Sequence, residues 1–135
     1  MNKDETGVYF GVFGFGDDPS VVTKIMGVLP SRSWVKGEPI TDNLRGVQSH
    51  SWWELRTPAD PSLSLEDQLV ALLLLLEDYK AQIDEVSEKF EAGICCYAYY
   101  YEELNPGLHL SEDTIRRLAD LRLSIDFDLY FLGED

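Results

Sequence analysis

The sequence predicts a single α+β domain over residues 1–135, with helices on one face of a four-stranded sheet and the other face partly open. The 135 residues are the length of one domain, and 44% of them are hydrophobic, which is enough for a core. Four short segments rich in aromatic and β-branched residues alternate with three helical segments. We therefore expect two βαβ units, one before and one after a long or broken leucine-rich helix.

The first strand and helix are marked by aromatic residues, an acidic cap and a glycine. The segment Gly7 to Phe15 (GVYFGVFGF) is aromatic and β-branched, which is typical of a strand. Residues 17–19 (Asp-Asp-Pro) then begin a helix, because acidic side chains satisfy free amide groups and proline suits a first turn. Gly27 ends that helix.

The second predicted strand follows a long connection. The irregular segment from Val28 to Arg45 exceeds the usual length of a connection, so we expect it to be functional or mobile. Residues Gly46 to Arg56 then alternate as a strand does. The alternation places Val47, Trp53 and Leu55 on one side and Gln48, His50, Trp52, Glu54 and Arg56 on the other.

The longest helical signal runs from about Leu65 to Phe90, with Ser64 as its cap. Five consecutive leucines at 72–76 make its middle apolar all round, so we expect that middle to be buried. A straight helix of this length would span roughly 39 Å, far more than the ~14 Å radius of gyration of such a chain. We therefore expect a bend or break between Glu77 and Asp84.

The C-terminal third predicts a strand, a helix and a strand. Ala92 to Glu102 is the third strand, and Asn-Pro-Gly at 105–107 is a turn. Ser111 caps the next helix. In the last strand, Leu123 to Phe131, apolar residues alternate with polar ones, so one face belongs to the core and the other to solvent.

Acidic residues outnumber basic ones by 25 to 11, which gives a formal net charge of −14. Residues 64–135 hold 17 of the acidic residues and only 5 of the basic ones. This charge repels phosphate backbones and anionic lipid surfaces, so we expect neither nucleic acid nor a membrane as a partner. The same field attracts a basic protein.

The reactive residue types are few. Cys95 and Cys96 are adjacent in a predicted strand and point to opposite faces, so we expect two reduced thiols and a reducing compartment. His50 and His109 are the only histidines and have no metal-ligand spacing, so we expect neither metal nor cofactor. With no targeting signal, and with Leu69 to Leu76 too short to span a membrane, the expected location is cytoplasmic.

Tyrosines occupy three alternate positions of the third predicted strand and line one of its faces. If the small side chains of Cys96 and Ala98 face the helices, these tyrosines point outward beside the acidic residues of the last strand. Tyr and Trp contribute much of the energy at protein interfaces. The alternative is that a loop buries the rings and leaves only the hydroxyls wet. The candidate partner-binding residues are Trp52, Tyr97, Tyr99, Tyr101, Asp126 and Asp128.

Several short motifs are shared with a known family. They are Gly-Val-Leu-Pro at 27–30, Trp34 with Lys-Gly-Glu at 36–38, Ser-Trp-Trp at 51–53, the leucine-rich helix and the final strand from Ile125 to Tyr130. Over nearly its whole length the sequence thus resembles the bacterial domain of unknown function 4279 family. The resemblance implies a small α+β cytosolic domain with no established activity, so it assigns no catalytic residue.

The sequence contains no local motif for nucleophilic catalysis, which favours a non-enzymatic role. We expect an acidic binding protein, and more specifically an immunity protein that binds and neutralises a cationic bacterial toxin such as a nuclease. The alternative is a small-molecule-binding or catalytic domain with a pocket under the 30–45 loop, near Trp34, Lys36 and His50. The sequence predicts no oligomeric state.

Overall fold

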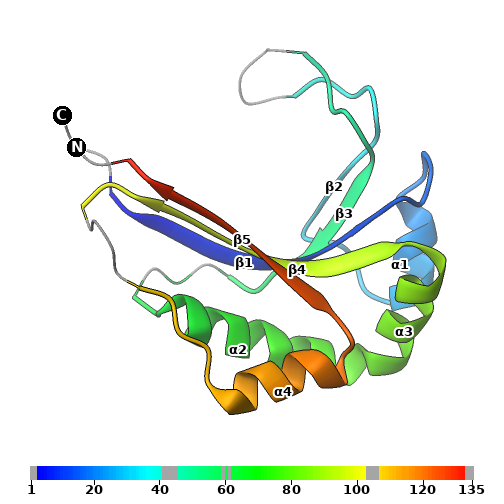
Figure 1. The fold of residues 1–135 in the computed structure, drawn as a ribbon. Coiled ribbons are helices and arrows are strands. Elements are labelled where there is room, and N and C mark those ends of the chain that lie inside the picture. The colour runs from blue at the N-terminus through cyan, green and yellow to red at the C-terminus, as the bar shows by residue number, and fades with distance from the viewer. Residues whose placement is uncertain (1–2, 41–45, 59, 61, 103–106, 133–135) are drawn as a thin grey trace.

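Within residues 3–40, 46–58, 60, 62–102 and 107–132, which the computed structural model describes, five strands form one mixed sheet and the helices lie against one of its faces (Figure 1). The N-terminal elements are β1 (Glu5–Phe13), α1 (Ser20–Met26), β2 (Arg32–Trp34) and β3 (Trp52–Leu55). They are followed by α2 (Leu65–Leu76), a 3-10 turn η1 (Glu77–Tyr79), α3 (Lys80–Lys89), β4 (Glu91–Tyr100), α4 (Glu112–Asp120) and β5 (Ser124–Phe131). The predicted α+β class is confirmed, with five strands instead of four.

The strands lie in the order β2-β3-β1-β4-β5. β4 and β5 are parallel and α4 connects them, which confirms the second predicted βαβ unit. The first predicted unit is wrong, because β1 and β3 are antiparallel. The missed strand β2 explains the difference. It follows α1 and pairs antiparallel with β3, so β3 lies between β1 and β2 and splits the unit.

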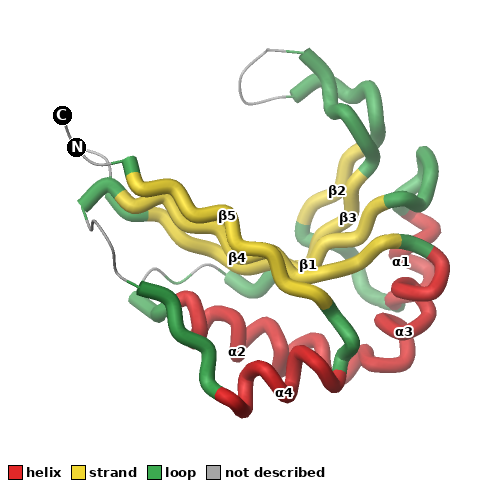
Figure 2. The backbone as a smooth tube through the Cα atoms, in the orientation of Figure 1, coloured by secondary structure: helices red, strands yellow, loops and turns green. Residues whose placement is uncertain are grey.

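The core lies between the sheet and the helices, which Figure 2 shows in red on one side of the yellow strands. Inward-facing residues of β1 pack against α2, those of β4 pack against α3, and all of them belong to one hydrophobic core with the leucines of α2. Trp53 is fully buried, and its indole N–H donates a hydrogen bond to Thr23 of α1 over 3.0 Å. The core-facing strand residues are Val8, Phe10, Val12, Trp53, Leu55, Ile94, Cys96, Ala98 and Tyr100.

The long leucine-rich segment breaks where its length predicts. α2 ends at Leu76, one 3-10 turn follows, and α3 begins at Lys80, inside the predicted interval. Ser64 and Ser111 accept hydrogen bonds from backbone amides in the first turns of α2 and α4, which confirms both caps. The left-handed φ of 73° at Gly27 likewise confirms the end of α1.

Two local predictions are wrong. Leu74, in the middle of the leucine run, is 61% exposed, because only the inward-facing leucines of α2 contact the sheet. The strand predicted from Gly46 to Arg56 covers only Trp52–Leu55, and Val47 is exposed in an isolated bridge to Pro39. In the predicted turn at 105–107, residues 105 and 106 lie outside the described residues, and Gly107 has a φ of 75°.

Candidate binding face

The sheet face turned away from the helices carries the candidate site, and we call it the open face. Its side chains are those that alternate with the core-facing ones. Tyr9 of β1 lies opposite Cys95 of β4, which lies opposite Asp126 of β5. One step along the sheet, Tyr97 lies opposite Asp128. Because successive residues of a strand point to opposite faces, these side chains emerge together.

Aromatic rings form a continuous band over the open face. Trp34 stacks on Trp52 with ring centroids 6.0 Å apart, and Trp52 meets Tyr9 edge-on at the same distance. Tyr9 contacts Tyr97 at 6.3 Å and Tyr97 contacts Tyr99 at 6.1 Å. The band ends at Tyr130, whose ring stacks on that of Tyr99 at 5.0 Å. Every strand of the sheet therefore contributes at least one ring.

Two glycines of β1 make room for this band. A Cβ atom at Gly11 would lie 2.5 Å from the Trp52 ring, and one at Gly7 would overlap the Tyr97 ring. Real Cβ atoms do not approach so closely, so the rings lie flat over backbone that has no side chain. Such aromatic coverage supports glycine within a strand. The two glycines therefore let these rings pack directly on the backbone of β1.

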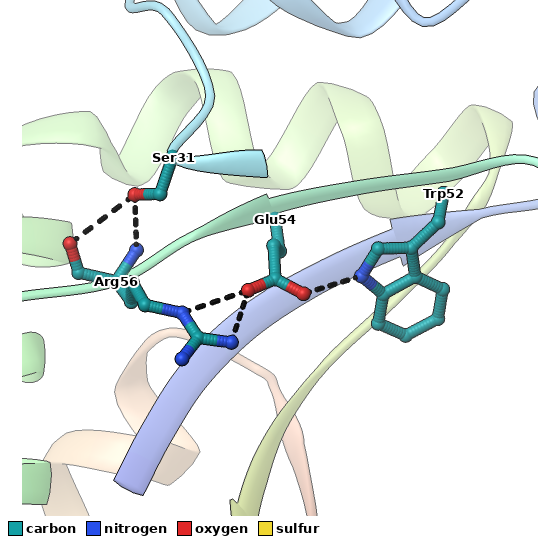
Figure 3. A network of polar contacts seen from close by, with 4 residues as sticks. All are labelled: Ser31, Trp52, Glu54 and Arg56. Atoms are coloured by element: carbon teal, nitrogen blue, oxygen red, sulfur yellow. Dashed lines mark hydrogen bonds and ion pairs between the residues drawn. The ribbon is translucent and has the colours of Figure 1, made fainter. Parts of the chain in front are cut away.

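A buried carboxylate orders the β3 side of the open face (Figure 3). Glu54 is only 2% exposed, although its side chain points away from the core. Its carboxylate accepts hydrogen bonds from the Trp52 indole N–H at 2.9 Å and from Nε of Arg56 at 2.7 Å, and it pairs with Nη2 of Arg56. Ser31 binds the backbone of Arg56 through its hydroxyl, which ties the connection before β2 to this network.

The Arg56 guanidinium also lies over aromatic rings. Its carbon atom is 5.0 Å from the ring centre of Tyr9 and 6.0 Å from that of Tyr97. A guanidinium at this distance from a ring face is attracted by the ring quadrupole. The carboxylate of Glu54 and the tyrosine rings therefore hold one positive charge from the chain itself.

A shallow groove of about 320 Å³ crosses the open face, with Arg32 and Arg56 in its wall toward β2 and β3 and Asp128 in its wall at β5. Asp128 lines this groove together with Tyr97, Tyr99 and Tyr130. The thiol of Cys95 donates a weak hydrogen bond to Asp128 over 3.5 Å. Partial burial and the nearby carboxylate raise the pKa of this thiol, and burial also raises the pKa of the neighbouring Tyr9 hydroxyl.

Five of the six predicted site residues lie on the open face. Tyr97 and Tyr99 are half-buried, Asp126 and Asp128 are exposed beside them, and Trp52 lies in the band toward β2. None of the helices in the described part of the chain covers this face, so the predicted outward orientation is confirmed for the rings of Tyr97 and Tyr99. The placement predicted for Tyr101 is wrong. It follows the end of β4, and its backbone N–H donates to Asp4 over 2.6 Å.

The predicted partner-binding residues do not include three members of the site, one of which, Trp34, was predicted only for the alternative pocket. Tyr9 lies within a glycine-rich aromatic strand, where no alternation separates the two faces. Trp34 lies in a segment expected to be irregular. Trp52, Glu54 and Arg56 occupy alternate positions of the predicted strand and so share its polar side. This spacing was the sequence signal that could have placed Arg56 in the site. A charged pair next to a tryptophan on one strand face indicates an ordered network.

The alternative site near Trp34, Lys36 and His50 is only partly assembled. Trp34 lines the groove of the open face, and His50 lies 6.0 Å from Trp52 with the rings edge-on. The Lys36 side chain is exposed, and its backbone N–H donates to Ser51 over 2.9 Å. Residues 41–45 of the predicted pocket loop lie outside the described residues, so this pocket stays a prediction.

Comparison with protein families matches residues 4–132 to the model of a domain of unknown function (DUF4279). The chain belongs to this family. The matched residues span β1 to β5, so the DUF4279 domain includes the whole sheet and its open face. Comparison with curated proteins and with solved structures found no match for this chain. Among the described residues, no helix has both the length and the apolar character needed to cross a membrane.

Ten of the 25 acidic residues of this DUF4279 domain lie on the helical side. These ten are among the 17 acidic residues of the second half and belong to α2, η1, α3 and α4. From that half, Asp126 and Asp128 of β5 and Glu91 at the start of β4 lie on the strand face that carries the aromatic band. Glu5 of β1 lines the groove together with Asp128, so the open face carries carboxylates from β1 as well as from β5.

Proposed function

We propose that this DUF4279 domain is a non-enzymatic binding protein whose open face docks a basic protein partner. The observation that carries the proposal is the aromatic band that crosses all five strands, on a sheet face that no helix among the described residues covers. Exposed sheet faces are usually polar, and a contiguous aromatic patch on a soluble domain marks an interaction site. Tyrosine and tryptophan are enriched among the residues that dominate binding energy.

Electrostatics supports a basic partner over an acidic one. The net charge of −14 raises the rate at which a basic protein reaches the surface, and Asp126 and Asp128 offer carboxylates next to the band. The same charge opposes the use of these rings for stacking nucleic-acid bases. In its most specific form, the proposal is a cytoplasmic immunity protein that covers a basic bacterial toxin such as a nuclease.

Co-expression with the protein encoded next to this chain tests the proposal. We expect the chain to rescue growth if the neighbour is toxic, and to copurify with it in a complex that weakens as salt rises. The double variant Tyr99→Ala/Asp128→Ala should reduce affinity by at least about 30-fold, because each side chain lies at the proposed centre of contact. Unchanged affinity in this variant removes the open face from the proposal.

A matched control separates the open face from general acidity. Leu74 and Asp78 are exposed on the helical side, so Leu74→Ala/Asp78→Ala removes one apolar and one acidic side chain there. We expect this control to bind the partner within about twofold of the unmodified chain. Equal losses in both double variants would show that total charge, not the aromatic face, governs binding.

A further inference from the structure

The open face binds its own guanidinium near β3, and the groove that Arg32 and Arg56 line there continues to a second set of tyrosine rings and a carboxylate at β5. On the β3 side, Arg56 lies 5.0 Å from the ring centre of Tyr9 and pairs with the carboxylate of Glu54. The components are a tyrosine ring face and a carboxylate at its margin. This arrangement shows how the face holds an arginine side chain.

The β5 side repeats these components. Tyr99 and Tyr130 stack with only 8° between their ring planes, and Tyr130 is 46% exposed. Asp128 precedes Tyr130 by two residues on the same strand face, which places it about 7 Å along β5. Of the ion pairs found between described residues, none includes Asp128 or Asp126.

We propose that the half-site formed by Tyr99, Tyr130 and Asp128 binds an arginine side chain of the partner. This inference rests on the proposed function and names the group that the partner inserts. The bound guanidinium lies over the tyrosine ring and donates hydrogen bonds to Asp128, as Arg56 does with Tyr9 and Glu54. A second copy of this chain is a poorer occupant, because each copy brings a net charge of −14.

Arginine suits this half-site better than lysine for two physical reasons. A planar guanidinium stacks on an aromatic ring and still presents a fork of N–H groups to a carboxylate. An ammonium is compact and strongly hydrated, and it cannot satisfy both contacts in one plane. The half-site is therefore expected to discriminate between two side chains of equal charge.

Nuclear magnetic resonance titration of the full chain with peptides tests the inference. The probes are identical glycine-serine peptides that carry arginine, lysine or citrulline at two positions. Citrulline retains the shape of arginine and lacks its charge. We expect the arginine peptide to bind about 5- to 10-fold more tightly than the lysine peptide, with shifts at backbone amides of β4 and β5. The citrulline peptide should bind more weakly than both.

Four variants make the test specific. Asp128→Asn should reduce the affinity for the arginine peptide about 5- to 10-fold, whereas Asp78→Asn on η1 removes the same charge and should change it less than about twofold. Tyr99→Leu should remove the preference for arginine over lysine, and Tyr99→Phe should keep it because the ring remains. The amide spectrum of each variant shows directly whether it is folded.

The outcomes separate this inference from the proposed function. If arginine and lysine peptides bind the open face equally, the arginine half-site is wrong and the basic-partner proposal stands. Shifts confined to the helical side contradict both. An absence of shifts with the arginine peptide at millimolar concentration also overturns the half-site.

Discussion

The two faces of the sheet use the same residue types for opposite purposes, and the adjacent residues Trp52 and Trp53 show this most directly. Trp53 is fully buried between the sheet and α1, where it contacts Phe10 and donates to Thr23. Trp52 points the other way, into the aromatic band, and donates to Glu54. One residue completes the hydrophobic core, and the next helps to build a surface.

Order on the open face comes from ring packing over glycine and from hydrogen bonds to a buried carboxylate, and the core formed by the described residues uses neither kind of contact. The rings of Trp52 and Tyr97 lie over Gly11 and Gly7, and Glu54 joins β3 residues through hydrogen bonds. A face held rigid in this way loses little conformational entropy when a partner binds.

Cys95 and Cys96 provide the first and largest contrast. Cys95 is partly exposed on the open face, whereas Cys96 is 1% exposed and burial raises its pKa to about 12. Cys96 should react with a thiol reagent only through unfolding, so we expect its modification to be at least about 1000-fold slower than that of Cys95. Mass spectrometry of partly modified protein measures both rates. Binding of the partner should protect Cys95, and equal rates for the two thiols would contradict the two-faced sheet.

Trp53→Ala should destabilise the domain by about 3 to 5 kcal/mol, because it opens a large cavity in the core. Urea denaturation measures the change in the free energy of unfolding. The fraction that remains folded should bind the partner with unchanged affinity, since Trp53 does not reach the open face. A loss below about 1 kcal/mol would mean that the core at β3 is loosely packed.

Glu54→Gln should destabilise by about 2 to 3 kcal/mol, because it leaves the Arg56 charge without its carboxylate. Glu54 has a side chain only 3% exposed, so solvent cannot replace the lost acceptor there. A double-mutant cycle with Arg56→Met measures the pair itself. A coupling free energy near zero would show that the two residues act independently.

Trp52→Ala should destabilise by only about 1 to 2 kcal/mol, less than Trp53→Ala, because Trp52 is partly exposed already. Its effect on partner affinity should be larger, with a loss of about 10-fold. Isothermal titration with the partner and urea denaturation together give both numbers. The reverse pattern, with high destabilisation and intact binding, would make Trp52 a core residue.

The sequence predicted the faces of the sheet better than its connections. The alternation in β5 and the small residues between the tyrosines of β4 placed Tyr97, Tyr99 and Asp128 on one face, because a strand has a fixed period of two. The breakpoint of the leucine-rich helix followed from chain length alone. These features depend on local geometry, which the sequence contains directly.

The remaining features depend on long-range pairing. β2 has only three residues, and β3 stabilises it by pairing across a long loop, so its own sequence carries little strand signal. Tyr9 and Arg56 come together because β1 and β3 are neighbours in the sheet. The order of strands decides this, and the residue pattern of a single strand does not predict it. Tyr101 continues the alternation of β4 but lies beyond its last paired residue.

The smallest predicted effect compares a carboxylate that has an internal cation with one that does not. On the helical side, Glu77 accepts hydrogen bonds from Nε and Nη2 of Arg117 at 2.9 and 2.8 Å, and these bonds hold its pKa below the ordinary value. Because the pKa is lowered in the folded state, the stabilisation is present above the unfolded pKa of about 4.3 and is lost as pH falls through the lower folded value.

Glu77→Gln should therefore lower the free energy of unfolding by roughly 0.5 kcal/mol near neutral pH, because the ion pair is partly exposed. At a pH low enough to protonate Glu77 in the unmodified chain, the substitution should have no effect. Asp128→Asn should leave the free energy of unfolding unchanged at both pH values, because no described guanidinium or ammonium pairs with Asp128 in the isolated chain. Urea denaturation of both variants at neutral and acidic pH measures the difference. If Asp128→Asn destabilises the domain as much as Glu77→Gln does, then Asp128 stabilises the fold. That result would contradict a role for its carboxylate in binding a partner.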